Sequence, residues 1–259
     1  MAPRGATADV VAAMGDFAAA EVASRGGRRP RYSRDPDANA LVFEDPFAFL
    51  LSTLFKQGIP AERASTAPYL LRERLGHLDP ARIAADPEGV AAAIATPPML
   101  HRFKVTMPRW VCAAARRVVE RYGGDAATIW SDRPTARELQ RRLAEFDGIG
   151  QKKAAMAVDL LSRDLGVDIA ELDGNDVAYD VHVRRVFLRT GLAAADRLEE
   201  VVDAARRASP ERPGGLDHPA WVIGRRWCRP RVPLCAQCPI EAACPQLVDR
   251  AAGVRGISS

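Results

Sequence analysis

The chain has 259 residues, of which 47% are apolar, so it is long enough to bury a substantial core in one or two domains. It contains no long uninterrupted apolar run, and we therefore expect no membrane span. The formal net charge of +4 is mild, and it permits an anionic partner such as nucleic acid without requiring one.

The N-terminal segment is rich in alanine, but Asp9, Asp16 and Glu21 interrupt it. This pattern is typical of an amphipathic helix and not of a signal peptide, whose central region is apolar throughout. Residues 26–40 contain several glycines, prolines and arginines, which predicts a linker between this helix and the main body.

The sequence pattern of the main body predicts mostly helices. From Pro46 to Leu165 helical patterns follow one another, separated by prolines and glycines. An irregular stretch, 168–176, then precedes another helical run that starts near Val181. The sequence therefore predicts an all-α protein.

Two of these helices can be placed closely. Thr135 and Glu138 have the spacing of a capping box, which predicts the start of a helix. This helix is expected to end at residues 147–150, Asp-Gly-Ile-Gly, where the next one begins. Such a turn presents unpaired backbone N–H groups at the positive end of a helix dipole, which is a ready site for an anion. Because Lys152 and Lys153 follow in the first turn, a DNA phosphate suits this site.

Lysine is rare in this chain. Of its 37 Lys and Arg residues only four are lysines, namely Lys56, Lys104, Lys152 and Lys153. An amine can lose its proton and attack a carbon atom, whereas a guanidinium stays charged. The adjacent pair is therefore a candidate for covalent chemistry, and the alternative is two solvated charges at a helix end.

Four of the five cysteines lie close together near the C-terminus, with the spacing C-x6-C-x2-C-x5-C: Cys228, Cys235, Cys238 and Cys244. Short loops of this kind bring four thiolates within reach of one soft metal centre. Structural zinc sites usually pair two short C-x2–4-C units, whereas this run has only one, which favours an iron–sulfur cluster over zinc. Clustered cysteines in a long chain also indicate a reducing cytoplasm. Cys112 is expected to be an inert buried thiol.

Four segments, in this order, resemble the HhH-GPD superfamily of DNA glycosylases. Residues 45–57 resemble the opening barrel helix, and 146–154 (F-D-G-I-G-Q-K-K-A) the helix-hairpin-helix. Residues 177–186 (V-A-Y-D-V-H-V-R-R-V) resemble the segment with the essential aspartate, and 228–244 the [4Fe–4S] loop of the endonuclease III branch. The resemblance covers residues 45–246, and the combination is far more specific than any one motif.

The resemblance implies roles for two residues. Lys152 stands where bifunctional members have the catalytic lysine, and Asp180 stands where the superfamily has its carboxylate. An ionised carboxylate stabilises the positive charge that builds on the deoxyribose when the N-glycosidic bond breaks. A lysine amine can attack C1′ and form a Schiff base, from which the 3′ phosphate is eliminated. Asp180 can also act as the N-cap of the following helix.

The resemblance further implies DNA contacts. The target base must leave the duplex stack, and Gln57 is the candidate to fill the gap, with an ordinary loop residue as the alternative. Arg184 and Arg185 are expected to be solvated or to face phosphate. The hairpin turn and the loop after the first cysteine are expected to contact the DNA backbone, through Gly148, Ile149, Gly150, Lys153, Arg229 and Arg231.

For the whole chain, the resemblance implies two helical domains that flank a DNA-binding cleft. We expect an N-terminal helix and linker at 1–41 packing with the cluster domain, and a six-helix barrel at 42–165 with the helix-hairpin-helix at 136–165. We expect a domain with the catalytic aspartate and the [4Fe–4S] cluster at 166–259. The expected partner is double-stranded DNA with a damaged or mismatched base, bound by a cytoplasmic, nucleoid-associated monomer that contacts no membrane.

Two departures from the family pattern leave the substrate open: Asp147 replaces a usual proline, and the stretch 168–176 is longer than usual. The adenine-mismatch branch ranks below an endonuclease III-like activity, because that branch has a glutamate where this chain has Thr53. The sequence thus predicts a base-excision-repair glycosylase with an AP lyase step. The alternatives are a monofunctional base or mismatch glycosylase, in which Lys152 only contacts phosphate, and a non-catalytic DNA-structure-binding protein on the same fold.

Overall fold

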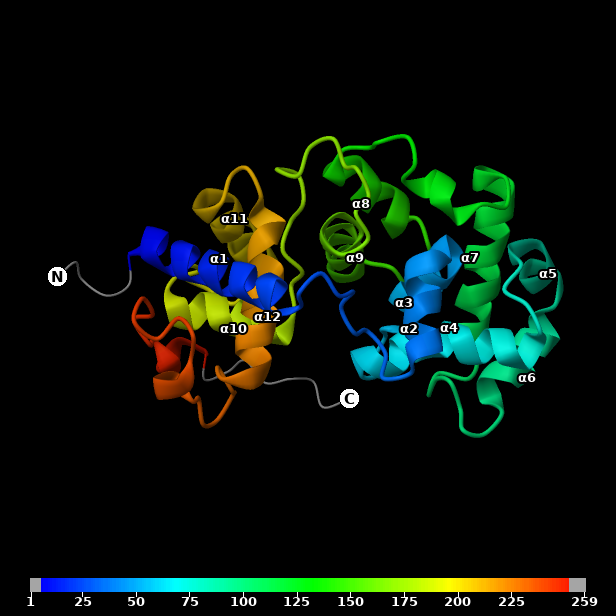
Figure 1. Ribbon diagram of the computed structural model, residues 1–259, viewed down its shortest axis with the longest axis horizontal. Helices are drawn as coiled ribbons and strands as arrows, with labels where there is room; N and C mark the ends of the chain where they lie inside the picture. Colours follow the sequence, from blue (N-terminus) through cyan, green and yellow to red (C-terminus); the bar gives the residue numbers. More distant parts are fainter. Residues whose placement is uncertain (1–5, 252–259) are drawn as a thin grey trace.

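A computed structural model describes residues 6–251 of the chain. These residues form two helical lobes that lie side by side along the longest axis of the molecule (Figure 1). The regular structure of this part of the chain consists of α-helices and short 3-10 helices, without a strand. The predicted all-α class is confirmed.

The first lobe contains the helix-hairpin-helix and a barrel-like packing of helices around one continuous core. Four of its helices start at an Asp-Pro pair, in which the aspartate side chain accepts backbone N–H groups and the proline occupies the first turn. The helices of this lobe are α2 (Pro36–Glu44), α3 (Pro46–Phe55), α4 (Ala61–Leu75), α5 (Pro80–Ala85), α6 (Pro87–Ala95), α7 (Thr106–Tyr122), α8 (Ala136–Ala144) and α9 (Gln151–Arg163).

Helix α3 lies at the centre of this lobe, and every residue from Phe47 to Phe55 is buried. A helix that is apolar on all sides is expected only where other helices surround it. Among the described residues, no single helix is long and apolar enough to cross a membrane. Helices α2 and α3 reach that composition only together, and they are bent by 113° relative to each other.

The second lobe combines both ends of the described chain. Its helix α1 packs against α11 and α12, although more than a hundred residues separate them in sequence. Its core is smaller than that of the first lobe and includes part of the cysteine loop. The helices are α1 (Thr7–Ser24), α10 (Val181–Thr190), α11 (Leu198–Ala208) and α12 (Asp217–Arg226).

Two arginines of α10 lie inside the second lobe. Arg185 is 1% exposed; its Nε donates to the carbonyl of Cys228 and its Nη2 to that of Gly224, each at 2.7 Å. Arg189 donates in the same way to the next two carbonyls of the cysteine loop. The prediction that Arg185 is solvated or faces phosphate is therefore wrong, because its guanidinium satisfies carbonyl groups at the end of α12.

The connection between α1 and the first lobe is shorter than the predicted linker. Helix α2 begins at Pro36, within the stretch 26–40. Asp164, at the end of α9, holds this connection. Its carboxylate accepts from the Tyr32 hydroxyl at 2.5 Å and from the Arg25 guanidinium at 3.2 Å.

The unusual stretch 168–176 joins the helix-hairpin-helix to the second lobe. It runs beside the start of α8, where Ala136 N donates to Glu171 O at 2.9 Å. Further along, Asp176 forms a two-pronged ion pair with Arg206 of α11, at 2.8 and 2.9 Å. The extra residues therefore brace the connection between the lobes.

Candidate active site at the junction of the lobes

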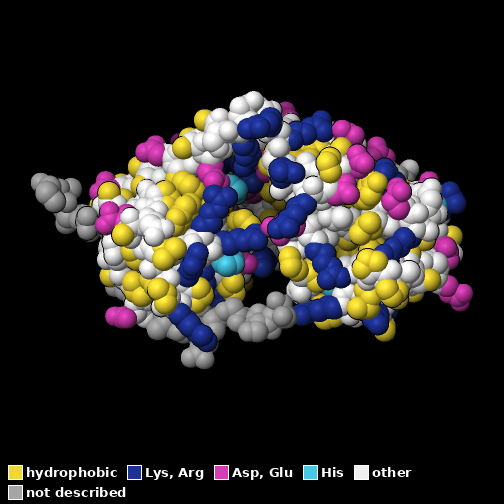
Figure 2. All heavy atoms as spheres, turned by 60° about the horizontal axis from the view of Figure 1, so that its bottom comes forward, with side chains coloured by type: hydrophobic (Ala, Val, Ile, Leu, Met, Phe, Trp, Pro, Cys, Tyr) yellow, Lys and Arg dark blue, Asp and Glu magenta, His cyan; other side chains and the backbone are white. Residues whose placement is uncertain are grey.

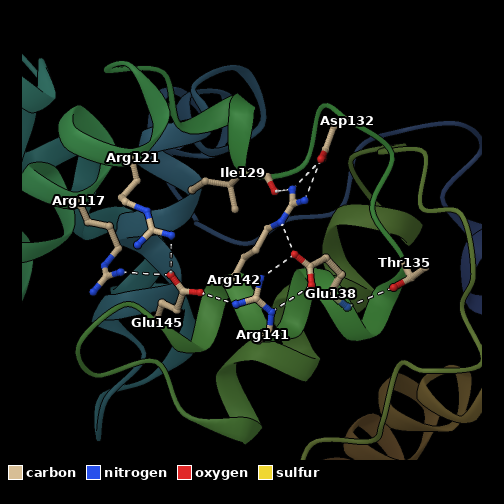
Figure 3. Close-up of polar contacts among 9 residues, drawn as sticks. All are labelled: Arg117, Arg121, Ile129, Asp132, Thr135, Glu138, Arg141, Arg142 and Glu145. Carbon is tan, nitrogen blue, oxygen red and sulfur yellow. Dashed lines mark hydrogen bonds and ion pairs between the residues drawn. The ribbon is translucent and has the colours of Figure 1, made fainter.

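Helix α8 starts as predicted but with only half of a capping box. The Thr135 hydroxyl accepts from the backbone N–H of Glu138 at 3.2 Å, which confirms the helix start. The Glu138 carboxylate does not complete the reciprocal bond. It accepts from Arg141 at 2.8 Å and from Arg142 at 3.0 Å, both on the same helix (Figure 3).

These arginines continue into an ion-pair network that fixes the first helix of the hairpin (Figure 3). Arg142 forms two bonds to Asp132, at 2.7 and 2.8 Å, in the preceding loop. Arg141 donates to Glu145 at 2.8 Å, and Glu145 also accepts from Arg117 of α7 at 3.2 Å. The network therefore anchors α8 to α7 on the outer side of the hairpin.

The hairpin turn has the geometry that an anion site requires. Gly148 has a positive φ of 82°, and a Cβ there would lie 2.5 Å from the Trp110 ring, so only glycine fits. Gly150 is the N-cap of α9, and no side chain caps this helix start. Space around Gly150 is open, with no atom within 4 Å of an added Cβ. The first-turn N–H groups of α9 are therefore free to bind an anion.

Lys152 and Asp180 come together where the lobes meet. Lys152 lies in the first turn of α9, and its side chain is 54% exposed. Asp180 is the N-cap of α10, with its side chain 8% exposed, and its Oδ1 accepts from the backbone N–H of His182 at 2.8 Å. The Lys152 Nζ lies 2.5 Å from Asp180 Oδ2. The N-cap role expected for Asp180 is present, and its other oxygen faces the lysine.

The environment of Asp180 keeps it ionised. Burial acts to raise the pKa of this carboxyl, but the Lys152 ammonium and the N–H of His182 outweigh burial and hold the pKa below its usual range. The exposed amine and the ionised carboxylate therefore form a close pair at the edge of the lobe junction.

Two residues that carried no signal in the sequence support the segment before Asp180. The carboxyl of Asp217, at the start of α12, accepts from Ala178 N at 2.7 Å. Burial raises the pKa of Asp217 to about 8, so this carboxyl is mostly neutral at pH 7. Gln151 contacts the same segment from the hairpin. Its place between Gly150 and Lys152 is the only feature of the sequence that could have singled it out.

Lys153 does not lie where the sequence placed it. Its side chain is 6% exposed, and the Nζ donates to Leu54 O at 2.8 Å and to Gly148 O at 2.9 Å. Burial and the charges of Lys152 and Lys56 lower its pKa to about 7. The predicted phosphate contact of Lys153 is wrong, because the amine joins the hairpin turn to the end of α3 inside the protein.

Several known proteins are similar to this chain in sequence or in fold. No protein-family model matches the sequence. The chain is 34% identical over 136 residues to adenine DNA glycosylase of Homo sapiens. The aligned segment is 50% of this chain but only 21% of the human protein. The chain is 29% identical over 202 residues to endonuclease III of Thermotoga maritima, and the alignment covers 77% of this chain and 83% of that protein. The solved structure of a trapped endonuclease III–DNA covalent intermediate matches the fold with a TM-score of 0.62 at 18% identity. The match covers 91% of this chain and 96% of that one.

The chain is endonuclease III-like in sequence and in fold. This confirms the resemblance noted in the sequence, and the two lobes correspond to the expected fold. The matched segment of the human relative is a small part of that protein. Activity, substrate and partners therefore follow below as proposals.

The four clustered cysteines are half-buried, form no disulfide within the described residues, and line one cavity beside α10 and α12. Among the described residues, no three His, Cys, Asp or Glu side chains are arranged to hold a single metal ion. A zinc ion needs four sulfurs about 2.3 Å from one point. Four sulfurs that line one cavity are also the donor set that an iron–sulfur cluster requires.

The surroundings of the thiols also fit such a group. Arg189 donates to the Cys228 sulfur at 3.5 Å, and the backbone N–H of Gln246 donates to the Cys244 sulfur at 3.4 Å. Hydrogen bonds of this kind stabilise iron-bound thiolates. Burial raises the pKa of Cys238 to about 11, so its thiolate needs a positively charged partner.

The remaining predicted DNA contacts are exposed or partly so. Gln57 lies exposed after the end of α3, and its carbonyl accepts from His101 Nε2 at 2.9 Å. Arg229 and Arg231 are exposed on the cysteine loop. Ile149 is the exception: its side chain is 3% exposed and packs in the core. Its backbone N–H donates to Phe146 O at 2.9 Å and is not free for a phosphate, which corrects the prediction for this residue.

The molecule is hollowed between the two lobes, and Lys and Arg side chains gather along the edges of this hollow (Figure 2). Asp and Glu side chains lie mostly toward the outer ends in the same view. Arg225 of α12 pairs with Glu62 of α4 at 3.1 Å, so the lobes also touch through charged groups. A basic hollow of this kind favours a polyanion over a neutral ligand.

Proposed function

We propose that this chain is a base-excision-repair DNA glycosylase with an AP lyase step. It flips and removes a damaged or mismatched base from double-stranded DNA, which it binds as a monomer. The observation that carries the proposal is the 2.5 Å contact between Lys152 and Asp180 directly beside an open helix start. Similarity to adenine DNA glycosylase and endonuclease III supports glycosylase chemistry. The trapped covalent intermediate of endonuclease III supports the lyase step.

In the first step, the free N–H groups at the start of α9 bind a phosphate next to the target nucleotide. This contact places the flipped sugar near Asp180. As the N-glycosidic bond breaks, the electron pair leaves with the base and positive charge develops on the deoxyribose. The ionised Asp180 carboxylate stabilises that charge.

In the second step, Lys152 supplies the nucleophile. Its ammonium loses a proton, and the Asp180 carboxylate at 2.5 Å is placed to accept it. The neutral amine attacks C1′ and forms a C–N bond. One amine proton then passes to O4′ as the C1′–O4′ bond breaks, which opens the sugar ring and leaves a protonated Schiff base. Loss of a C2′ proton then expels the 3′ phosphate and cuts the strand.

Borohydride trapping on DNA with an abasic site tests the lyase step. Wild type is expected to form a covalent adduct, and Lys152→Ala to form none. Lys104→Ala is the matched control, because this exposed lysine before α7 is not part of the ion pair with Asp180. Absence of an adduct with wild type, or a full yield with Lys152→Ala, refutes the lyase assignment.

Base release measured separately from strand cleavage distinguishes the alternatives. A monofunctional glycosylase releases base and leaves the strand intact. A non-catalytic DNA-structure binder does neither, and Asp180→Asn leaves its DNA binding unchanged. The proposed enzyme is expected to lose about 10²–10³-fold in the rate of base release with Asp180→Asn. A panel of duplexes with single lesions or mismatches, read by the same assay, identifies the base.

We also propose that Cys228, Cys235, Cys238 and Cys244 hold a [4Fe–4S] cluster. When bound, the cluster gives the loop a fixed shape, because it ties four points of the chain to one group. Arg229 and Arg231 on the same loop then face the DNA backbone. Anaerobic purification followed by iron, sulfide and zinc analysis tests this. Four irons and four sulfides per chain are expected, and a single zinc ion without sulfide contradicts the proposal.

A further inference from the structure

Side chains hold the backbone of residues 177–179, the segment that leads to Asp180. The Gln151 amide contacts it twice: Nε2 donates to Val177 O at 3.0 Å, and Oε1 accepts from Tyr179 N at 3.5 Å. Between these two bonds, Ala178 N donates to Asp217 at 2.7 Å. An extended segment is thus paired on both edges, as it would be in a sheet, although no strand is present in residues 6–251.

The Gln151 amide spans the junction between the two cores. Gln151 is the first residue of α9, which packs in the core of the first lobe. Val177 is fully buried in the core of the second lobe. The next residue after Gln151 is Lys152, and the next after Tyr179 is Asp180. The same side chain therefore joins the two backbone segments that carry the reactive pair.

We propose that Gln151 is a positioning residue whose side-chain amide sets the approach of Lys152 Nζ to the Asp180 carboxylate. This inference rests on the proposed function, since the pair it positions is the one assigned to catalysis. The chemistry of the side chain suits the task. A primary amide offers a donor and an acceptor at one end, so it can pair with the carbonyl and the N–H of alternate residues in an extended chain. A carboxylate, an ammonium or a hydrocarbon of similar length can make at most one of these bonds.

The pair is sensitive to this support because its partners come from different lobes. The Lys152 side chain is 54% exposed, whereas that of Asp180 is 8% exposed, and the backbone before Asp180 sets where this carboxylate lies. Around Asp180 lie the Lys152 ammonium from α9, His182 and Arg185 from α10, and Asp217 from α12. Misplacement of a reacting group by about 1 Å can cost about 10²-fold in rate.

The chain offers a matched control in Gln140 of α8. Its amide also holds the connecting segment, with Nε2 donating to Gly174 O at 3.2 Å and to Asn175 Oδ1 at 2.8 Å. It lies farther from Asp180 along the chain. Gln151→Met and Gln140→Met therefore each remove two hydrogen bonds of a side-chain amide from neighbouring parts of the same connection, and only the first is expected to affect the pair.

The first readout needs no catalysis. The carboxyl of Asp180 is titrated by ¹³C NMR in the full-length protein without DNA, with Asp180→Asn assigning the signal. In wild type its pKa is expected below the ordinary aspartate range, and in Lys152→Met it rises. Gln151→Met is expected to raise it as Lys152→Met does, while Gln140→Met leaves it at the wild-type value. An unchanged titration in Gln151→Met overturns the inference.

The second readout is the single-turnover rate of adduct formation on abasic DNA. Gln151→Met is expected to lower it about 10-fold to 100-fold with unchanged DNA affinity, and Gln140→Met to keep it within about twofold. Gln151→Glu retains the acceptor for Tyr179 N, so its rate is expected to lie between those of Gln151→Met and Gln140→Met. This variant replaces Gln151→Met in the test if Gln151→Met does not fold. Equal rates for all variants contradict the inference. If wild type forms no adduct, the lyase proposal fails, while the Asp180 titration still decides the role of Gln151.

Discussion

The two lobes are stabilised in different ways. The first lobe surrounds a helix, α3, whose residues from Phe47 onward are all buried, and its core is continuous and mainly aliphatic and aromatic. The second lobe has a smaller core, and it buries the guanidinium groups of Arg185 and Arg189 beside four half-buried thiols. Apolar burial dominates the first lobe, whereas the second adds hydrogen bonds from buried guanidinium groups and, in our proposal, a metal group held by its cysteines.

The proposed catalytic pair takes one residue from each lobe. Lys152 belongs to the lobe with the large core, and Asp180 to the lobe that depends on the cysteine loop. Any change that destabilises the second lobe is therefore expected to displace Asp180 and to lower the reaction rate, although the proposed reaction does not involve the thiols themselves. The following predictions test this contrast, beginning with the largest effect.

Cys235→Ser is expected to unfold the second lobe and to leave the first lobe folded. Binding of a metal group by thiolates contributes about 10 kcal/mol or more to the folding of small metal-dependent units, far more than one ordinary side chain. Hydrogen exchange read by mass spectrometry is expected to show lost protection in α10, α11 and α12 and retained protection in α3 and α7. Cys112→Ala is the control, since this thiol is buried in the first lobe. Uniform loss of protection in both lobes contradicts the contrast.

Arg185→Met is expected to destabilise the second lobe by about 3 kcal/mol. The substitution keeps the apolar stem but leaves the carbonyls of Gly224 and Cys228 without their buried donor. The adjacent Arg184 is the control. Its ion pair with Asp196, at 3.3 Å, lies nearer the surface, so Arg184→Met is expected to cost about 1 kcal/mol or less. Urea unfolding, monitored by a probe in the second lobe such as Trp227 fluorescence, measures the free energy of unfolding of both variants. Equal losses of stability would refute the structural role assigned to Arg185.

Much of the fold could be predicted from local sequence. The Asp-Pro pairs at Asp45 and Asp79 start helices by chemistry contained within a few residues, and Thr135 starts α8 in the same way. Lys152, Asp180 and the cysteines could be singled out as candidates because their residue types follow a recognisable order along the chain, and the structure brings Lys152 and Asp180 together. What the sequence does not contain is the distance between segments that meet only after folding.

The wrong predictions are those that depend on such distant contacts. Lys153 looked like a phosphate ligand because it follows a glycine turn, but its amine bonds Leu54 O, 99 residues away. Arg185 looked solvated, but its partner Cys228 lies 43 residues further on. Gln151 has no local signal, since its two partners lie 26 and 28 residues away. In each case a polar side chain meets backbone groups that no local pattern reveals.

Lys153→Met tests the one buried lysine amine that joins α3 to the hairpin. The pKa of Lys153 in the folded chain, about 7, lies below its ordinary value of 10.5. The unfolded chain therefore binds more protons between these values, and the stability that Lys153 contributes rises with pH across this window. Thermal unfolding is expected to show that wild type gains about 3 kcal/mol of stability relative to Lys153→Met between pH 7 and pH 10. Lys104→Met is the control, and a pH-independent difference for Lys153→Met contradicts the prediction.

The smallest effect is expected from the ion-pair network on the outer side of the hairpin (Figure 3). Glu145→Gln removes the carboxylate that links Arg141 of α8 to Arg117 of α7. Because these groups are partly solvated, the expected loss is about 0.5 kcal/mol at low salt, and it disappears near 1 M salt as the charges are screened. Glu44→Gln, whose pair with Arg29 is more exposed, is expected to lose still less. A loss for Glu145→Gln that persists at high salt would show that charged groups stabilise the first lobe as they do the second, and the contrast between the lobes would then be wrong.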